Sequence, residues 1–166
     1  MLENKQDWWF ELLLDIIYYL LRDTADKVQS QKTDQVVVNT LVDSLYKNFI
    51  PWIHLLSLDF ELIIVDRSSQ CLLTLLQLYA ISQDENKKQL YFTEEHMNNL
   101  LESLGSEKRV VIKRILKCIY WALSQPEYKI KMDANMTNRL VRYLEKFVSS
   151  EDKAISTTSR EIYKII

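Results

Sequence analysis

Glycine and proline are scarce in this chain, which has only Gly105, Pro51 and Pro126 among its 166 residues. Sheet-rich proteins use many glycines in turns and bulges, so this scarcity favours an all-helical fold. A phosphate-cradling loop needs clustered glycines, and a single glycine cannot form one. Nearly half of the residues are apolar (48%), which is typical of a globular chain long enough to bury a core.

Histidine and cysteine are rare as well, with two of each. His54 and His96 both lie in predicted helices without a cysteine or carboxylate at ligand spacing, so we expect no metal site. No nucleophile-elbow pattern is present, and we expect neither catalysis, nor a cofactor, nor a small-molecule substrate. Cys71 and Cys118 lie within apolar helical runs, where an unpaired thiol behaves as a small buried hydrophobe.

Long apolar runs are missing too. No uninterrupted stretch of 18 apolar residues occurs, and the N-terminal "MLENKQDWW" has neither a basic region nor a small-residue cleavage site. We therefore expect no signal peptide and no membrane span. The prediction that follows is an intracellular protein of the cytoplasm or nucleus, with reduced cysteines.

The chain does contain an internal repeat. "YAISQDENKKQL", from Tyr79 to Leu90, matches "WALSQPEYKIKM" 42 residues later, with identical residues at five of the aligned positions, namely Ala80/Ala122, Ser82/Ser124, Gln83/Gln125, Glu85/Glu127 and Lys87/Lys129. A fixed period of about 40 residues is a signature of helical solenoids, in which each unit buries its apolar side against the next.

The whole chain, 1–166, is predicted to be a single domain. The apolar periodicity divides this domain into repeat units. The units are 7–58, 59–104, 105–148 and a partial unit 149–166. Three long helices, Asp7–Arg22, Phe60–Ser82 and Glu107–Ser124, are predicted to stack in sequence order, with a solvated loop at 24–34. Shorter helices are expected at 35–46, 49–58, 85–92, 94–104, 127–132 and 138–148. Thr93 and Ser150 are predicted N-caps, and Gly105 a helix C-terminal signal.

These units resemble the armadillo-repeat family. "FIPWIHLLS", with Pro51, is similar to the second helix of that repeat. "YWALSQ" and "YAISQ" are similar to the end of its third helix, with Trp121 and Tyr79 at the family's tryptophan position. The resemblance implies a right-handed α-solenoid of about ten helices, with partial repeats at both ends. It also implies that Gln83 and Gln125 hold the family's asparagine positions, which clamp an extended peptide. The related HEAT type of repeat remains an alternative.

Charge is distributed unevenly along the chain. Residues 1–104 contain 8 Lys/Arg and 16 Asp/Glu, residues 105–148 contain 10 and 4, and residues 149–166 contain 3 and 3, so a total of −2 hides an acidic two-thirds and a basic third unit. One stripe of the helix 107–125 carries the basic and aromatic residues Arg109, Lys113 or Arg114, Lys117, Trp121 and Gln125. Two interpretations stay open: Trp121 packs on the next repeat, or the stripe lines a groove for an acidic partner segment.

The candidate partner-binding residues are therefore Arg114, Lys117, Trp121, Gln125, Tyr79, Gln83 and Lys113. A second question concerns Trp8 and Trp9 at one end of the predicted solenoid. Either both rings are core, or they mark a terminal surface for docking or self-association.

The function predicted from these features is a non-catalytic protein–protein interaction module or scaffold that docks a segment of a partner protein within a larger complex. One alternative is a nucleic-acid-binding repeat that uses the basic third unit, although the isoelectric point of about 5.7 disfavours it. The other alternative is a self-associating structural subunit.

Overall fold

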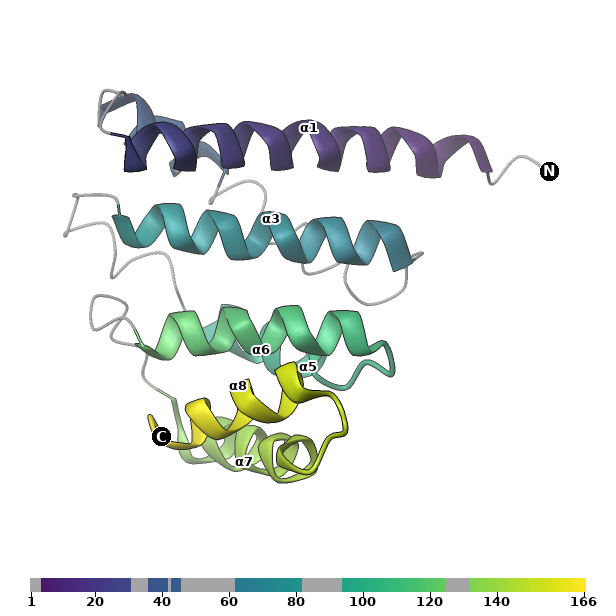
Figure 1. Cartoon of the computed structure of the whole chain (residues 1–166), viewed down its shortest axis with the longest axis vertical. Coiled ribbons are helices and arrows are strands. Elements are labelled where there is room, and N and C mark those ends of the chain that lie inside the picture. Colours follow the sequence, from purple (N-terminus) through teal and green to yellow (C-terminus); the bar gives the residue numbers. More distant parts are fainter. Residues whose placement is uncertain (1–3, 31–35, 42, 46–61, 82–93, 125–131) are drawn as a thin grey trace. The chain divides into compact units, whose positions relative to one another are not determined.

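The computed structural model of the chain describes residues 4–30, 36–41, 43–45, 62–81, 94–124 and 132–166. Every regular element in these ranges is a helix and none is a strand, so the predicted all-α class is confirmed for them. The helices with complete bounds are α1 (Asn4–Gln29), α3 (Leu62–Ile81), α5 (Glu94–Ser103), α6 (Arg109–Ser124), α7 (Ala134–Val148) and α8 (Lys153–Tyr163) (Figure 1). Residues 36–41 and 43–45 are helical as well.

The number of helices in the described ranges is smaller than the ten predicted for the whole chain. The right-handed solenoid arrangement stays a prediction. The predicted helices at 49–58 and 85–92, the N-cap at Thr93 and all but the last residue of the helix at 127–132 lie outside the described residues. Met132 itself is not helical.

The chain divides into two compact units, Met1–Asp84 and Glu85–Ile166. In the first unit α1 packs along α3, and the two helices lie side by side (Figure 1). Leu14 and Leu21 of α1 are fully buried, as are Leu75 and Leu78 of α3. The spacing is seven residues in α1 and three in α3, so each helix contributes one apolar stripe to the contact.

α1 is longer than the sequence pattern indicates. The loop predicted at 24–34 is wrong for residues 24–29, which continue the helix to Gln29. The hydroxyl of Thr24 donates to the carbonyl of Leu20 at 2.7 Å, and Lys27 forms an ion pair with Asp23 one turn earlier at 2.6 Å. No glycine or proline interrupts this stretch, so the helix continues through a buried Thr24 and an exposed ion pair.

The second unit contains α5, α6, α7 and α8. α6 contacts α5 and α8, and α7 contacts the same two helices. The side of α6 predicted to be apolar is buried at Val111, Ile112, Ile115, Leu116 and Ile119. Arg139 of α7 also donates to the amide oxygen of Asn98 on α5 at 3.1 Å. These four helices therefore share one core.

Two helix starts in this unit differ from the prediction because aspartates cap them. Asp133 accepts from the amide of Met136 at 2.6 Å, so α7 begins at Ala134, four residues earlier than predicted. Asp152, and not Ser150, is the N-cap of α8, because its carboxylate reaches two amides of the first turn. Ser150 instead accepts from the amide of Asp152. Aspartate is among the best N-cap residues.

Gly105 ends α5 as predicted, since its amide donates to the carbonyl of Glu102 at 2.9 Å. The single glycine lies where the α5–α6 link approaches α7. A Cβ atom at this position would lie 3.1 Å from the Glu102 carbonyl oxygen and 3.3 Å from the hydroxyl of Tyr143. Because these two oxygen atoms lie so close, a residue without a side chain fits this position best.

Candidate functional site

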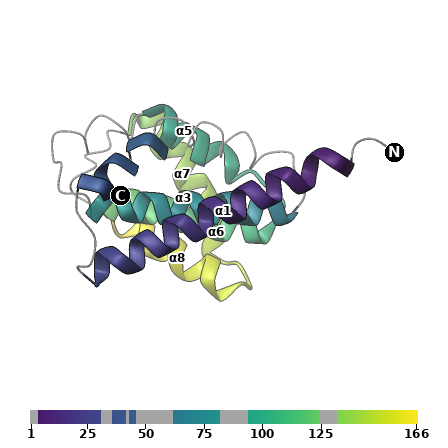
Figure 2. The ribbon, with the colours of Figure 1, turned by 90° about the horizontal axis from the view of Figure 1, so that it is seen from above.

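α1 exposes a row of large apolar side chains on the side opposite to α3. Trp9 is 62% exposed, Tyr19 59% and Ile16 56%. We call the complete row the outer face of α1; it consists of Trp8, Trp9, Leu12, Leu13, Ile16, Tyr19 and Leu20. Successive positions of the row are one or three residues apart, and its members recur at spacings of three, four and seven residues, so they lie on one side of the helix. Figure 2 looks down on α1, which lies in front of α3 in this view.

The two tryptophans at the start of the row lie against each other. Their ring centroids are 4.1 Å apart and their planes are inclined by 31°. Of the two alternatives left by the sequence, the structure therefore places both rings on the surface and not in the core of the first unit. Exposed aromatic pairs of this kind occur where a binding surface supplies large rigid contact area.

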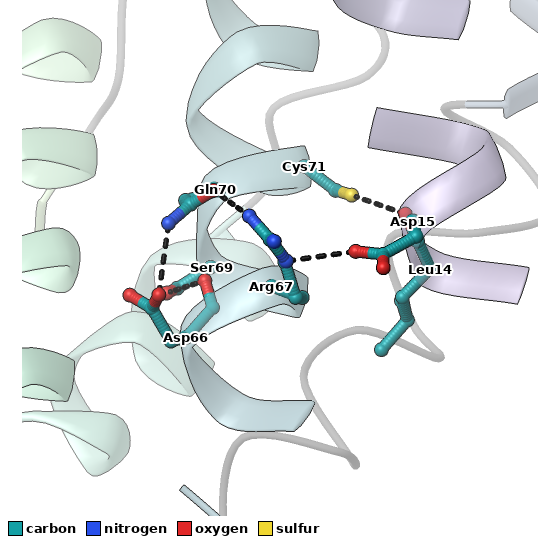
Figure 3. A network of polar contacts seen from close by, with 7 residues as sticks. All are labelled: Leu14, Asp15, Asp66, Arg67, Ser69, Gln70 and Cys71. Carbon is teal, nitrogen blue, oxygen red and sulfur yellow. Dashed lines mark hydrogen bonds and ion pairs between the residues drawn. The ribbon is translucent and has the colours of Figure 1, made fainter. Parts of the chain in front are cut away.

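The rotation of α1 about its axis is fixed by polar contacts with α3 (Figure 3). Asp15 Oδ1 lies 2.7 Å from Arg67 Nε, and both side chains are about 30% exposed. The same guanidinium lies over the ring of Tyr18, 5.5 Å from its centroid. The thiol of Cys71 donates to the carbonyl oxygen of Leu14 at 3.6 Å. Together these contacts hold the charged side of α1 next to α3 and leave the outer face uncovered by it.

Arg67 is itself positioned by residues of its own helix. Arg67 Nη1 donates to Gln70 Oε1 at 3.2 Å, and Gln70 Nε2 donates to Asp66 Oδ2 at 2.9 Å (Figure 3). The Oδ1 atom of Asp15 is buried and makes no well-aligned hydrogen bond within the described residues. The short ion pair with Arg67 therefore compensates most of its charge, because a buried carboxylate oxygen without a partner would be costly.

The predicted basic stripe on α6 is brought together only in part. Lys117 is exposed, and Arg114 and Trp121 are half-buried on the same side of the helix. Lys113 lies on α6 as well but forms an ion pair with Asp152 at 2.6 Å, which ties α6 to the start of α8. Gln125 and Gln83 lie outside the described residues, as does the side chain of Tyr79.

Three side chains have shifted acidities with clear causes. The Lys113 ammonium, followed by the first amides of α8, lowers the pKa of the Asp152 carboxyl below its ordinary 3.8. Desolvation raises the pKa of both thiols, Cys71 and Cys118, from 9.0 to about 12. Both thiols are buried and free of disulfides, so they are protonated at neutral pH and poor nucleophiles.

Within the described ranges, no group of three or more His, Cys, Asp or Glu side chains could hold a metal ion. No helix in the same ranges combines the length and apolarity needed to cross a membrane.

Sequence reasoning singled out Trp8 and Trp9 but missed the rest of the outer face. Leu12 and Ile16 belong to the apolar part of the predicted helix Asp7–Arg22, whereas Tyr18 or Tyr19 was expected on its polar stripe. Periodicity gives the apolar residues no direction, because α1 has them on two opposite sides. The sequence signal that could have revealed this face is the width of the apolar arc around α1. A helix that packs on one neighbour needs one stripe, and a second stripe indicates a second contact.

Comparison of the chain with protein-family models, with curated proteins and with solved structures found no match.

Proposed function

We propose that this chain is a non-catalytic protein–protein interaction module, and that the outer face of α1 is its contact surface. The observation that carries the proposal is the size of the uncovered apolar row. With roughly half of each of the seven residues exposed, and on the order of 200 Å² of accessible surface per large residue, the row presents on the order of 700 Å². The largest apolar patch of a typical monomer covers only ~300–600 Å², and larger patches mark interaction sites.

The armadillo-like repeat is part of this proposal and is supported by the 42-residue self-match. Helical repeats serve as binding scaffolds because each unit adds surface without needing its own closed core. The basic stripe of α6 is a second, smaller surface of the same module. Lys117 is exposed there and Trp121 is half-buried one turn further on, which suits an acidic segment.

A charge placed in the middle of the outer face tests the main surface. Ile16→Glu should abolish binding of any protein that docks there, because a carboxylate would be buried without a partner. The matched control is Ile63→Glu on α3, where an isoleucine is 45% exposed outside the outer face. Both variants should keep the circular dichroism and melting temperature of the wild type.

The measurement is a quantitative comparison of proteins, including further copies of the chain, that associate with the tagged full-length wild type and the two variants. Each associated protein is then purified and titrated directly. Trp9→Ala should weaken its binding about 30-fold, the loss expected for a hot-spot aromatic. The proposal fails if every association is equally strong with wild type and Ile16→Glu.

A further inference from the structure

Resting on the proposed function, we infer that the occupant of the outer face is a second copy of this chain, whose α1 lies antiparallel to the first. An interface between identical chains related by a twofold axis must be self-complementary, because the same patch is used on both sides. The outer face meets this condition in its spacing, in its charge and in its area.

The spacing is that of a two-stranded helical seam. Trp9, Leu12, Ile16 and Tyr19 are separated by steps of three, four and three residues, which are the steps of the a and d positions of a heptad. All four are more than 40% exposed, so the seam is open along its full length. Trp8, Leu13 and Leu20 flank it and widen the apolar surface.

The row is also symmetric about its midpoint, which lies at the level of Leu14. Reversing the helix about this level exchanges position 8 with 20, position 9 with 19 and position 12 with 16. In an antiparallel pair, Leu12 therefore lies level with Ile16 of the second copy, and Trp9 lies level with its Tyr19. Aliphatic side chains meet in the middle and aromatic side chains meet at both ends, where offset ring contacts add to the burial.

Charge favours the antiparallel direction. Asp23 occupies the next position of the heptad after Tyr19 and is exposed, with Lys27 of the same helix offsetting part of its charge. A parallel pair would place the two copies of Asp23 opposite each other, whereas reversal about the level of Leu14 separates them by ~27 Å along the axis. Asp15, the charged residue nearest to the seam centre, is directed to Arg67. The antiparallel arrangement also opposes the two helix dipoles.

The area suits a stable pair. If both copies cover the ~700 Å² of the row, the interface buries on the order of 1,400 Å², within the ~1,200–2,000 Å² of stable protein complexes. A membrane surface is the less suitable occupant. Side chains described between Trp8 and Val28 include four acidic residues (Glu11, Asp15, Asp23, Asp26) and two basic ones (Arg22, Lys27), whereas helices that lie on anionic lipid are rich in Lys and Arg.

The oligomeric state of the full chain is the first test. Light scattering after size exclusion, over a concentration series up to about 50 μM, should give twice the 19.8 kDa chain mass for wild type and for Ile63→Glu. Ile16→Glu should elute as a monomer with unchanged helical content. A monomeric wild type at every concentration overturns the inference.

Single cysteines test the direction. Leu13→Cys lies one residue from the midpoint, so its two copies are offset by only ~3 Å along the axis of an antiparallel pair. Leu20→Cys copies are offset by ~18 Å in the same arrangement. A short thiol cross-linker at pH 7.5 should therefore join Leu13→Cys into a covalent dimer and leave Leu20→Cys unjoined. Cys71 and Cys118 should not react, since both thiols are buried and protonated.

The outcomes separate this inference from the proposed function. Cross-linking of both variants means a parallel pair and overturns the antiparallel geometry. A monomeric wild type that binds a different protein through Ile16, or binds anionic vesicles, overturns the second copy as occupant and leaves a contact surface in place. A monomeric wild type destabilised by Ile16→Glu means that another segment of the same chain covers the row. If the wild type is monomeric and none of its associations is weakened by Ile16→Glu, both the second copy as occupant and the proposed contact surface are overturned.

Discussion

Arg67 links the two helices of the first unit through a single guanidinium. Its Nε atom pairs with Asp15 Oδ1, its Nη1 atom donates to Gln70, and its planar face lies over Tyr18. The pairing matters because the Asp15 oxygen is buried and has no well-aligned hydrogen bond in the described part of the chain. Removing the guanidinium would strand a charge and would not merely delete a favourable contact.

We expect Arg67→Met to lower the free energy of unfolding by about 1–2 kcal/mol, a value reduced for the partial exposure of the pair. The double variant Asp15→Asn/Arg67→Met should be more stable than the sum of the single losses predicts, because the two groups are coupled. Urea denaturation at pH 7 measures the free energy of unfolding of the wild type, Asp15→Asn, Arg67→Met and the double variant.

Lys27→Met is the matched control, since the Lys27–Asp23 pair is more than half exposed on one helix. It should cost less than about 0.5 kcal/mol. Equal losses for Arg67→Met and Lys27→Met, with additive behaviour in the double variant, would contradict the role given to Arg67.

At the scale of elements, α8 depends on one carboxylate with two tasks. Asp152 Oδ1 accepts from the amides of Ala154 and Ile155, and Oδ2 pairs with Lys113 of α6. Asp152→Asn keeps an N-cap acceptor and removes the charge, whereas Asp152→Ala removes both. The urea midpoint should therefore fall in the order wild type, Asn variant, Ala variant.

Acid should weaken this contribution. The pKa of Asp152 lies below its ordinary 3.8 in the folded chain, first because of Lys113 and then because of the α8 amides. The unfolded chain thus takes up the proton first, and the stabilisation present above pH 3.8 is lost as the pH falls through the folded value. Urea midpoints between pH 2 and pH 6 should converge for wild type and Asp152→Asn at the acid end. A constant difference over this range would contradict the assignment.

Several elements could be predicted from the sequence because local signals determine them. The apolar stripes placed α3 and the buried side of α6 within one or two residues of their observed bounds, and Gly105 marked the end of α5. Helix starts were less predictable. Asp133 and Asp152 compete with neighbouring serine, threonine and asparagine residues, and only the geometry of the bound amides decides between them.

The outer face of α1 could not be predicted from sequence for a different reason. Its helix has two apolar sides, and periodicity alone does not say which side packs on α3. The contact of Asp15 with Arg67 decides the matter, and it joins positions far apart in the chain. Tertiary partners of this kind leave no local pattern, so Trp8 and Trp9 could be named as candidates but not placed.

At the scale of the whole molecule, the chain consists of two units, each with its own buried residues. In Glu85–Ile166 the four helices bury a continuous set, Leu100, Leu101, Leu116, Ile119, Leu140, Leu144 and Ile162. A set of this kind shared among four helices is the usual condition for independent folding.

We expect residues 85–166, expressed alone, to fold into a helical monomer. Circular dichroism should show a helix, and urea should unfold it in one cooperative transition. The fragment lacks α1, so it should remain monomeric at concentrations where the full chain pairs. A fragment without helical signal would show that the second unit depends on the first for its stability.

The contact between α1 and α3 also has a consequence for synthesis. Leu14 and Cys71, which meet through a carbonyl and a thiol, are 57 positions apart. At translation rates of ~5–20 residues per second, α1 waits about 3–11 seconds before α3 follows it out of the ribosome. During that time both apolar sides of α1 are open to other molecules. Neighbouring ribosomes on one messenger carry the same helix at high local concentration, so the antiparallel pair would form earliest there, before either chain is complete.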